Sequence, residues 1–227
     1  MILCHGQYVQ VTSEARVSCQ RLLDDVANLI SHHPKIRSPG VGKPPGNTKP
    51  LLNACTVLTY TAWEVYVEDL LLEAIPYLQR DYSDLPRKLR KRIADRVQDN
   101  PWRLADNSWK REVAKAVKSI SIGEIGTWGI NTANTRNVND AFEEVFGSRL
   151  LDRCSWKGIS AATVKVYVDQ LVRRRGAIVH RGKPDPADGT LTLATVKDWA
   201  AWVGNLANKV DELSAAALAD LTGNAAW

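Results

Sequence analysis

The sequence of 227 residues has few of the features that mark metal-binding, secreted or membrane-spanning proteins. Its four cysteines are far apart, and none forms a CxxC motif or a Cys/His pair at zinc-ligand spacing. Cys19 and Cys55 fall within apolar helical patterns, so we expect buried thiols in a reducing cytosol rather than disulfides. The first residues lack the basic region and apolar core of a signal peptide. No stretch is apolar for the ~18 residues that a membrane span needs. We therefore expect a cytoplasmic protein without a membrane partner.

Strand signals are also scarce, and the only candidate is a short strand at Leu191–Leu193. Helical periodicity dominates instead, and the expected fold class is all-α. The helical periodicity predicts helices at about residues 12–33, 50–79, 136–146, 160–180 and 195–221. It also predicts two shorter helices within residues 80–118, separated by a break near Asn100-Pro101. We divide the chain into residues 1–48 (a helix and a Pro/Gly-rich basic loop), 49–221 (a helical domain with a basic insertion at 80–118) and 222–227 (a tail).

Positive charge is concentrated in the insertion. The net charge is +5, and residues 80–118 hold 12 Lys/Arg against 6 Asp/Glu. Such a balance permits an acidic partner such as RNA without requiring one. We interpret the insertion as a solvated helical face, with Trp102 and Trp109 packed in the core. Four cations on or beside the Pro/Gly-rich loop are interpreted in the same way: Lys35, Arg37, Lys43 and Lys49.

One decapeptide, Arg-Arg-Arg-Gly-Ala-Ile-Val-His-Arg-Gly at residues 173–182, carries the strongest chemical signal. The apolar stripe of its helix runs through Val168, Leu171 and Ile178, and Arg175 occupies the position missing from that stripe. A buried arginine needs a partner because it does not deprotonate. Glu64 is the only charge between residues 51 and 67 of the most apolar helix, so we predict an Arg175–Glu64 contact.

His180 follows Arg175 by five positions, which on a helix is about 140° around the axis and ~7.5 Å along it. The two side chains converge only if the helix loosens at Gly176, if the arginine spans the gap, or if a second chain contributes its own copy. This geometry favours a dimeric site. A histidine can move a proton near neutral pH, and an arginine can stabilise a phosphorane, so the pair suits RNA cleavage by the RNA's own 2′-OH.

The decapeptide resembles the Arg-x4–6-His signature of HEPN domains, an all-α superfamily with many metal-independent ribonucleases. Three further segments resemble its RiboL-PSP-HEPN branch: a helix at residues 54–71 with an internal Glu, an Asn-rich lead at 131–139 to a Phe146-Gly147 helix end, and a long final helix. The resemblance implies a dimeric antiparallel helical bundle with additional helices. It also implies an endoribonuclease that cleaves single-stranded RNA to a 2′,3′-cyclic phosphate as a toxin or anti-phage defence effector, with an antitoxin or a defence protein as a further partner.

When the functional residues of the HEPN family are matched to this sequence, the resemblance implies that Arg175 and His180 are the catalytic pair. Glu64 matches the acidic position in the family's early helix. We assign supporting roles to Glu64, Arg174 and Arg181, RNA contacts to Lys183 and Arg173, and no metal or cofactor. Arg174 and Arg173 also satisfy spacings of five and six, but the helical register favours Arg175. Gly176 replaces the polar residue usual after the arginine. Two alternatives stay open: a non-catalytic HEPN module that binds RNA or a partner protein, and a helical scaffold without an RNA role.

Overall fold

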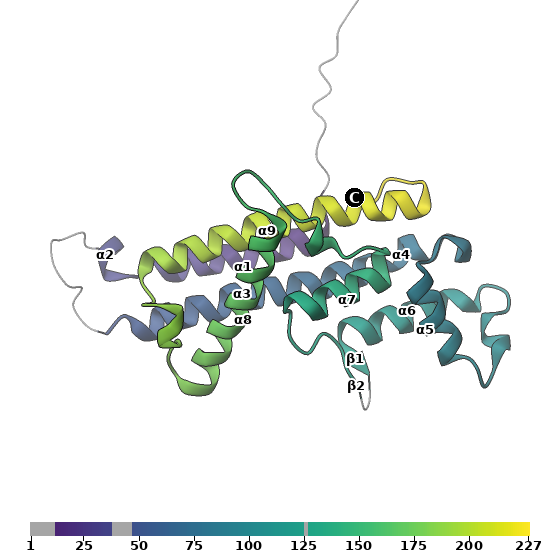
Figure 1. The fold of residues 1–227 in the computed structure, drawn as a ribbon, viewed down its shortest axis with the longest axis horizontal. Helices are drawn as coiled ribbons and strands as arrows, with labels where there is room; N and C mark the ends of the chain where they lie inside the picture. Colours follow the sequence, from purple (N-terminus) through teal and green to yellow (C-terminus); the bar gives the residue numbers. More distant parts are fainter. Residues whose placement is uncertain (1–11, 38–46, 125–126) are drawn as a thin grey trace, which may run out of the picture.

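The computed structural model describes residues 12–37, 47–124 and 127–227, and these are mainly helical (Figure 1). The predicted all-α class is confirmed. Cys4, Lys43 and most of the Pro/Gly-rich loop lie outside the described residues. The long helices are α1 (Glu14–Ser31), α3 (Lys49–Glu73), α8 (Ala161–Arg181) and α9 (Leu193–Thr222). The shorter elements are α2 (Pro34–Arg37), α4 (Ile75–Leu78), η1 (Tyr82–Asp84), α5 (Arg87–Arg96), η2 (Pro101–Leu104), α6 (Ser108–Ser121), β1 (Gly123–Glu124), β2 (Thr127–Trp128), α7 (Thr135–Phe146), η3 (Leu150–Asp152) and η4 (Pro186–Asp188).

Helices α1, α3 and α9 lie side by side along the long axis of the molecule (Figure 1). Their ends are joined by polar contacts. The Glu73 carboxylate at the end of α3 accepts hydrogen bonds from the first two amides of α1, Glu14 N at 3.0 Å and Ala15 N at 2.9 Å. Ser13, the N-cap of α1, donates its amide to the buried Asp211 of α9 at 3.3 Å. Helix α1 is therefore antiparallel to both neighbours and shares their core.

The apolar length of α3 explains why it lies at the centre of the bundle. Tyr60, Trp63 and Tyr66 of this helix are among the largest fully buried side chains, together with Phe142 and Phe146 of α7. The predicted burial of Cys19 and Cys55 is confirmed. Burial raises the pKa of the Cys19 thiol to about 11, although Arg16 nearby lowers it. This thiol stays protonated at neutral pH and behaves as a core residue.

Two details of the predicted secondary structure are wrong at the C-terminal side. Leu191–Leu193 is not a strand, because Leu193 is the first residue of α9 and both leucines pack against a small core cluster between α1, α3 and α9. The N-cap of α9 is Thr192, whose side chain accepts from Thr195 N at 3.1 Å, so this helix begins earlier than its predicted start at Thr195. The described residues do contain one small hairpin, β1–β2.

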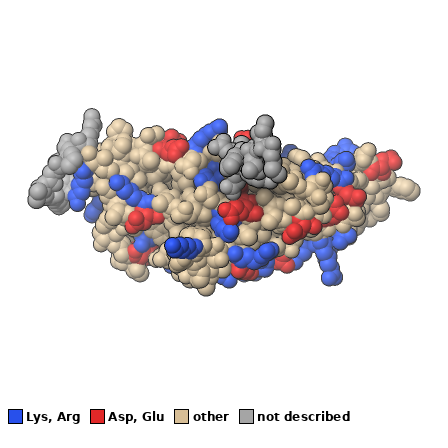
Figure 2. Space-filling model, turned by 90° about the horizontal axis from the view of Figure 1, so that it is seen from above, with Lys and Arg blue, Asp and Glu red and all other residues tan. Residues whose placement is uncertain are grey.

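The basic insertion forms the two helices predicted for it, α5 and α6, separated by η2. Six of its cations lie in ion pairs with acidic side chains: Lys88, Lys91, Arg92, Arg96, Arg103 and Lys115. On the face drawn in Figure 2, basic and acidic side chains are interspersed and form no single positive surface. Trp109 packs against the core as expected, but Trp102 does not, because it lies on the one-turn η2 and is 81% exposed. Within the described segments, no helix is long and apolar enough to cross a membrane.

Candidate functional site

Helix α8 carries the decapeptide, and its ends are set by local sequence. Ser160 caps its first turn by accepting from Thr163 N at 3.2 Å. Gly182 ends it in the left-handed region, with φ 67°, a conformation that favours glycine. The helix runs without a break through Gly176. Loosening at Gly176 is therefore not how Arg175 and His180 could meet.

The three arginines of α8 have different surroundings. Arg173 is exposed, Arg174 is only 6% exposed, and Arg175 is half-buried. The expectation that Arg175 alone points inward is wrong. Leu171 is one helical turn before both positions, at spacings of three and four, so Arg174 and Arg175 both fall on the inner side of α8. Spacing along the helix therefore does not distinguish Arg174 from Arg175.

Arg175 lies over the ring of Tyr60 on α3, with 5.2 Å from its guanidinium carbon to the ring centroid. The Tyr60 hydroxyl donates to Glu64 Oε1 at 2.6 Å. No direct ion pair joins Arg175 and Glu64 in the described residues, so the predicted contact is corrected to an indirect one through Tyr60. Tyr60 occupies the space beside the arginine because it is one helical turn before Glu64 on the same face.

Burial raises the pKa of Tyr60 well above its ordinary value, and the hydrogen bond to Glu64 raises it further. The hydroxyl therefore remains a donor at neutral pH. It also accepts a hydrogen bond from Ala133 N at 3.2 Å, while Trp63 Nε1 donates to Ala133 O at 3.0 Å. The Asn-rich lead to α7 is thereby fixed to α3 next to Arg175. Thr135 continues this link to α8, because its hydroxyl donates to Lys165 O at 2.9 Å.

Arg174 holds the loop that follows α8. Its Nη2 donates to the carbonyl oxygen of Asp188 in η4, and its guanidinium carbon lies 5.7 Å from the ring centroid of Trp199 on α9. Its Nε and Nη1 are buried without a hydrogen-bond partner in the described residues, as is Asp188 Oδ2. This arginine is enclosed by protein and joins α8, η4 and α9. These contacts are structural, and the supporting role at the candidate site predicted for Arg174 stays a prediction.

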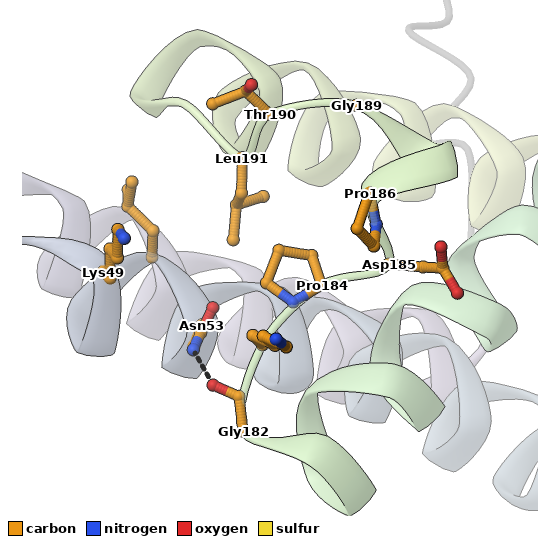
Figure 3. A pocket seen from close by; sticks show the side chains of 11 residues that line it. Lys49, Asn53, Gly182, Pro184, Asp185, Pro186, Gly189, Thr190 and Leu191 are labelled. Carbon is orange, nitrogen blue, oxygen red and sulfur yellow. Dashed lines mark hydrogen bonds between the residues drawn. The ribbon is translucent and has the colours of Figure 1, made fainter.

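His180 lies exposed in the last turn of α8. Three contacts fix the chain around it. Arg181 forms an ion pair with Asp185 at 3.0 Å, and the hydrogen bond from Ala187 N, together with this ion pair, lowers the pKa of the Asp185 carboxyl group. The side-chain amide of Asn53 on α3 donates to Gly182 O at 3.2 Å (Figure 3). The histidine is thus presented to solvent on an anchored helix end.

A pocket of about 390 Å³ opens beside this helix end (Figure 3). Its walls come from the first turns of α3, from the loop after α8 and from the residues before α9. Lys183, predicted to contact RNA, is one of the lining residues, and so is Lys49. The interpretation of Lys49 as a loop residue is wrong, because Lys49 is the first residue of α3. Its side chain lines the pocket.

Sequence reasoning missed three residues of this region: Tyr60, Asn53 and Ala133. Tyr60 had a detectable signal, since a tyrosine four residues before an isolated glutamate on one helix favours a side-chain hydrogen bond. Asn53 and Ala133 act through long-range contacts that no local pattern shows. Among the described residues, no three His, Cys, Asp or Glu side chains gather as metal ligands.

The RiboL-PSP-HEPN family model matches residues 20–216, which is most of the chain. This match, together with the helical fold, places the protein in a defined class of all-α modules. The chain belongs to the RiboL-PSP-HEPN family. The search of curated proteins and the search of solved structures found no match.

Proposed function

We propose that this protein is a metal-independent endoribonuclease that cleaves single-stranded RNA. The observation that carries the proposal is the state of Arg175. In the described residues it donates no hydrogen bond, and of its guanidinium nitrogens only Nε is buried without a partner. Both Nη groups are left to bind a phosphate, while the ring of Tyr60 lies 5.2 Å from the guanidinium carbon and supports the group.

The chemistry follows from the two residue types. In the reaction the O2′–P bond forms, the P–O5′ bond breaks, and the products are a 2′,3′-cyclic phosphate and a 5′-hydroxyl. One proton leaves the 2′-OH and one is added to the departing O5′; His180 carries out one of these two transfers and a water molecule the other, while Arg175 stabilises the charge on the phosphorane oxygens. A general base or acid of this kind contributes ~10²–10⁴-fold to the rate.

The arrangement in one chain supports a homodimer. Arg175 points inward against α3, whereas His180 is exposed at the end of the same unbroken helix. A second copy that brings its own α8 would place the histidine of one chain near the arginine of the other. The biological role that we propose is that of a toxin or a defence effector, with an antitoxin or a defence protein as a partner.

The experiment that tests the activity is RNA cleavage in EDTA by the wild type and by His180→Ala and Arg175→Ala. Matched controls are His32→Ala at the C-cap of α1 and Arg111→Ala on α6, both exposed. We expect both site variants to lose at least ~10²-fold in rate and both controls to keep wild-type activity. Equal, metal-independent cleavage by all five proteins would overturn the proposal. Growth arrest on expression, relieved by His180→Ala, tests the toxin role.

The second candidate is a non-catalytic RNA-binding module. The observation that favours it is the divergence of Arg175 and His180 within one chain, because a protein that stays monomeric would have no composite site. A wild type that binds RNA, stays monomeric and leaves the RNA intact would select this alternative.

A further inference from the structure

The pocket lies at the C-terminal end of α8, the helix that presents His180. Gly182, one of its lining residues, is two positions after His180, which corresponds to ~3 Å along a helix axis. The hydrogen bond from Asn53 to Gly182 O crosses the base of the pocket (Figure 3). The pocket therefore begins two residues beyond the histidine along the chain, although the His180 side chain is not one of its lining residues.

The walls combine apolar surface with positive charge. In Figure 3 the Leu191 side chain projects into the space that Pro184 and Asn53 border, and the Asp185 carboxylate points away from it. Lys49 and Lys183 also line the pocket, and neither is ion-paired in the described parts of the chain. A flat ring whose face packs on apolar side chains, joined to an anionic group, matches this combination, and a nucleotide is such a ligand.

The pocket wall is attached to the same helical turn that carries Arg175. Arg174 is bonded to the carbonyl oxygen of Asp188, and the ion pair between Arg181 and Asp185 joins α8 to the start of the same loop. These contacts fix the wall relative to α8. A ligand in the pocket is then held in a constant position relative to the reacting groups, which is how binding orients a substrate for reaction.

We propose that this pocket binds one nucleotide of the RNA strand, next to the phosphate that is cleaved. The base packs against Leu191 and Pro184, and Lys49 and Lys183 bind the adjoining phosphate. The pocket thereby determines where along a strand cleavage occurs. This inference rests on the proposed ribonuclease function, since it assigns the pocket to the substrate of the same site.

The test measures binding separately from cleavage. A fluorescent single-stranded oligonucleotide with 2′-O-methyl groups has no nucleophile, so its affinity is measured in EDTA by anisotropy. Leu191→Trp fills the pocket, and Ile122→Trp adds the same bulk at a position that is 60% exposed on the end of α6. We expect Leu191→Trp to weaken binding about tenfold or more, the loss of one base contact, and Ile122→Trp to leave it unchanged.

A second variant keeps the proposal testable if Leu191→Trp does not fold. Lys49→Glu alters an exposed residue at the pocket, and we expect it to weaken binding. We also expect the slope of the logarithm of the binding constant against the logarithm of the salt concentration to become shallower by about one unit or more. Unchanged affinity in the folded pocket variants would overturn the inference. It would also be overturned if AMP, GMP, CMP or UMP bound in a Leu191-dependent way while the oligonucleotide did not, since a free nucleotide would then be the ligand.

Failure of the proposed function has a different signature. If the wild type cleaves no RNA but binds the oligonucleotide through the pocket, the catalytic proposal fails and the pocket remains an RNA site. If the wild type cleaves a random RNA pool and Leu191→Trp cleaves it at the same rate and the same sites, the pocket inference fails and the catalytic proposal stands.

Discussion

Replacing Tyr60 with phenylalanine tests the indirect connection between Arg175 and Glu64. The substitution keeps the ring under the Arg175 guanidinium and removes only the hydroxyl, which donates to Glu64 at 2.6 Å and accepts from Ala133 N at 3.2 Å. Tyr60 is 1% exposed and Ala133 is fully buried. Water therefore cannot replace the lost partner of the Ala133 amide.

The expected loss has two parts. An unsatisfied buried amide costs ~1–3 kcal/mol, and the bond to the half-buried Glu64 contributes about 1 kcal/mol, since that carboxylate can regain water. We expect the free energy of unfolding to fall by about 2–4 kcal/mol. For a chain of this length, each kcal/mol lowers the melting temperature by ~2–4 °C. The shift should then lie between about 4 and 16 °C.

The assay is urea and thermal denaturation followed by circular dichroism, with Tyr82→Phe as the matched control. Tyr82 is half-buried beside Trp109, and its hydroxyl makes no hydrogen bond within the described residues. We expect the control to change stability by less than about 0.5 kcal/mol. If Tyr60→Phe is no less stable than Tyr82→Phe, the reasoning about the Ala133 amide is refuted.

Three further predictions concern stability. Arg174→Ala should lower the free energy of unfolding by about 2–3 kcal/mol, because it removes the bond to Asp188 O and the contact with Trp199 and leaves the vacated space empty. Arg174→Met removes the same bond and the same two unpaired buried donors but fills most of that space, so it should cost much less. Urea titration compares the two variants, and equal losses would contradict this account. Gly176→Ala should stabilise the protein by about 0.5–1 kcal/mol, because the position is helical and an added Cβ meets nothing within 4 Å; a lower melting temperature would count against it. The pKa of Tyr60 is raised by burial and by Glu64, so the folded protein holds this proton more tightly than the unfolded chain does. The contribution of Tyr60 to the free energy of unfolding should therefore be complete below pH 10.0, its ordinary pKa, and should decrease as the pH rises above that value. The urea midpoint between pH 8 and 11 should then fall less steeply in Tyr60→Phe than in the wild type.

Helix boundaries could be predicted from the sequence where a single residue type determines them. Gly147 and Gly182 both end helices in the left-handed region, with φ 69° and 67°, and Ser160 caps α8 as its position suggested. The start of α9 was misassigned because both Thr192 and Thr195 are acceptable N-caps. The packing of Leu193 into the small core cluster decides between them, and that packing is a tertiary effect.

The position of the helix that carries the candidate site could be predicted from the sequence. The helix that carries Arg175 and His180 is where the periodicity places it, and His180 falls in its last turn. The partner of Arg175 does not follow from charge alone. The space next to the arginine is taken by Tyr60, an aromatic side chain that the apolar pattern of α3 treats as core. The pocket could not be predicted, since its walls come from segments more than a hundred residues apart in the chain.

Mixing two inactive variants tests the central claim most directly. Arg175→Ala and His180→Ala are each expected to be inactive, and they are mixed in equal amounts under conditions that exchange subunits. If the arginine of one chain acts with the histidine of the other, half of the dimers are mixed and each regains one of its two sites. RNA cleavage in EDTA should then return to about a quarter of the wild-type rate, with 2′,3′-cyclic phosphate products. An active wild type whose mixed variants stay inactive would contradict the composite site.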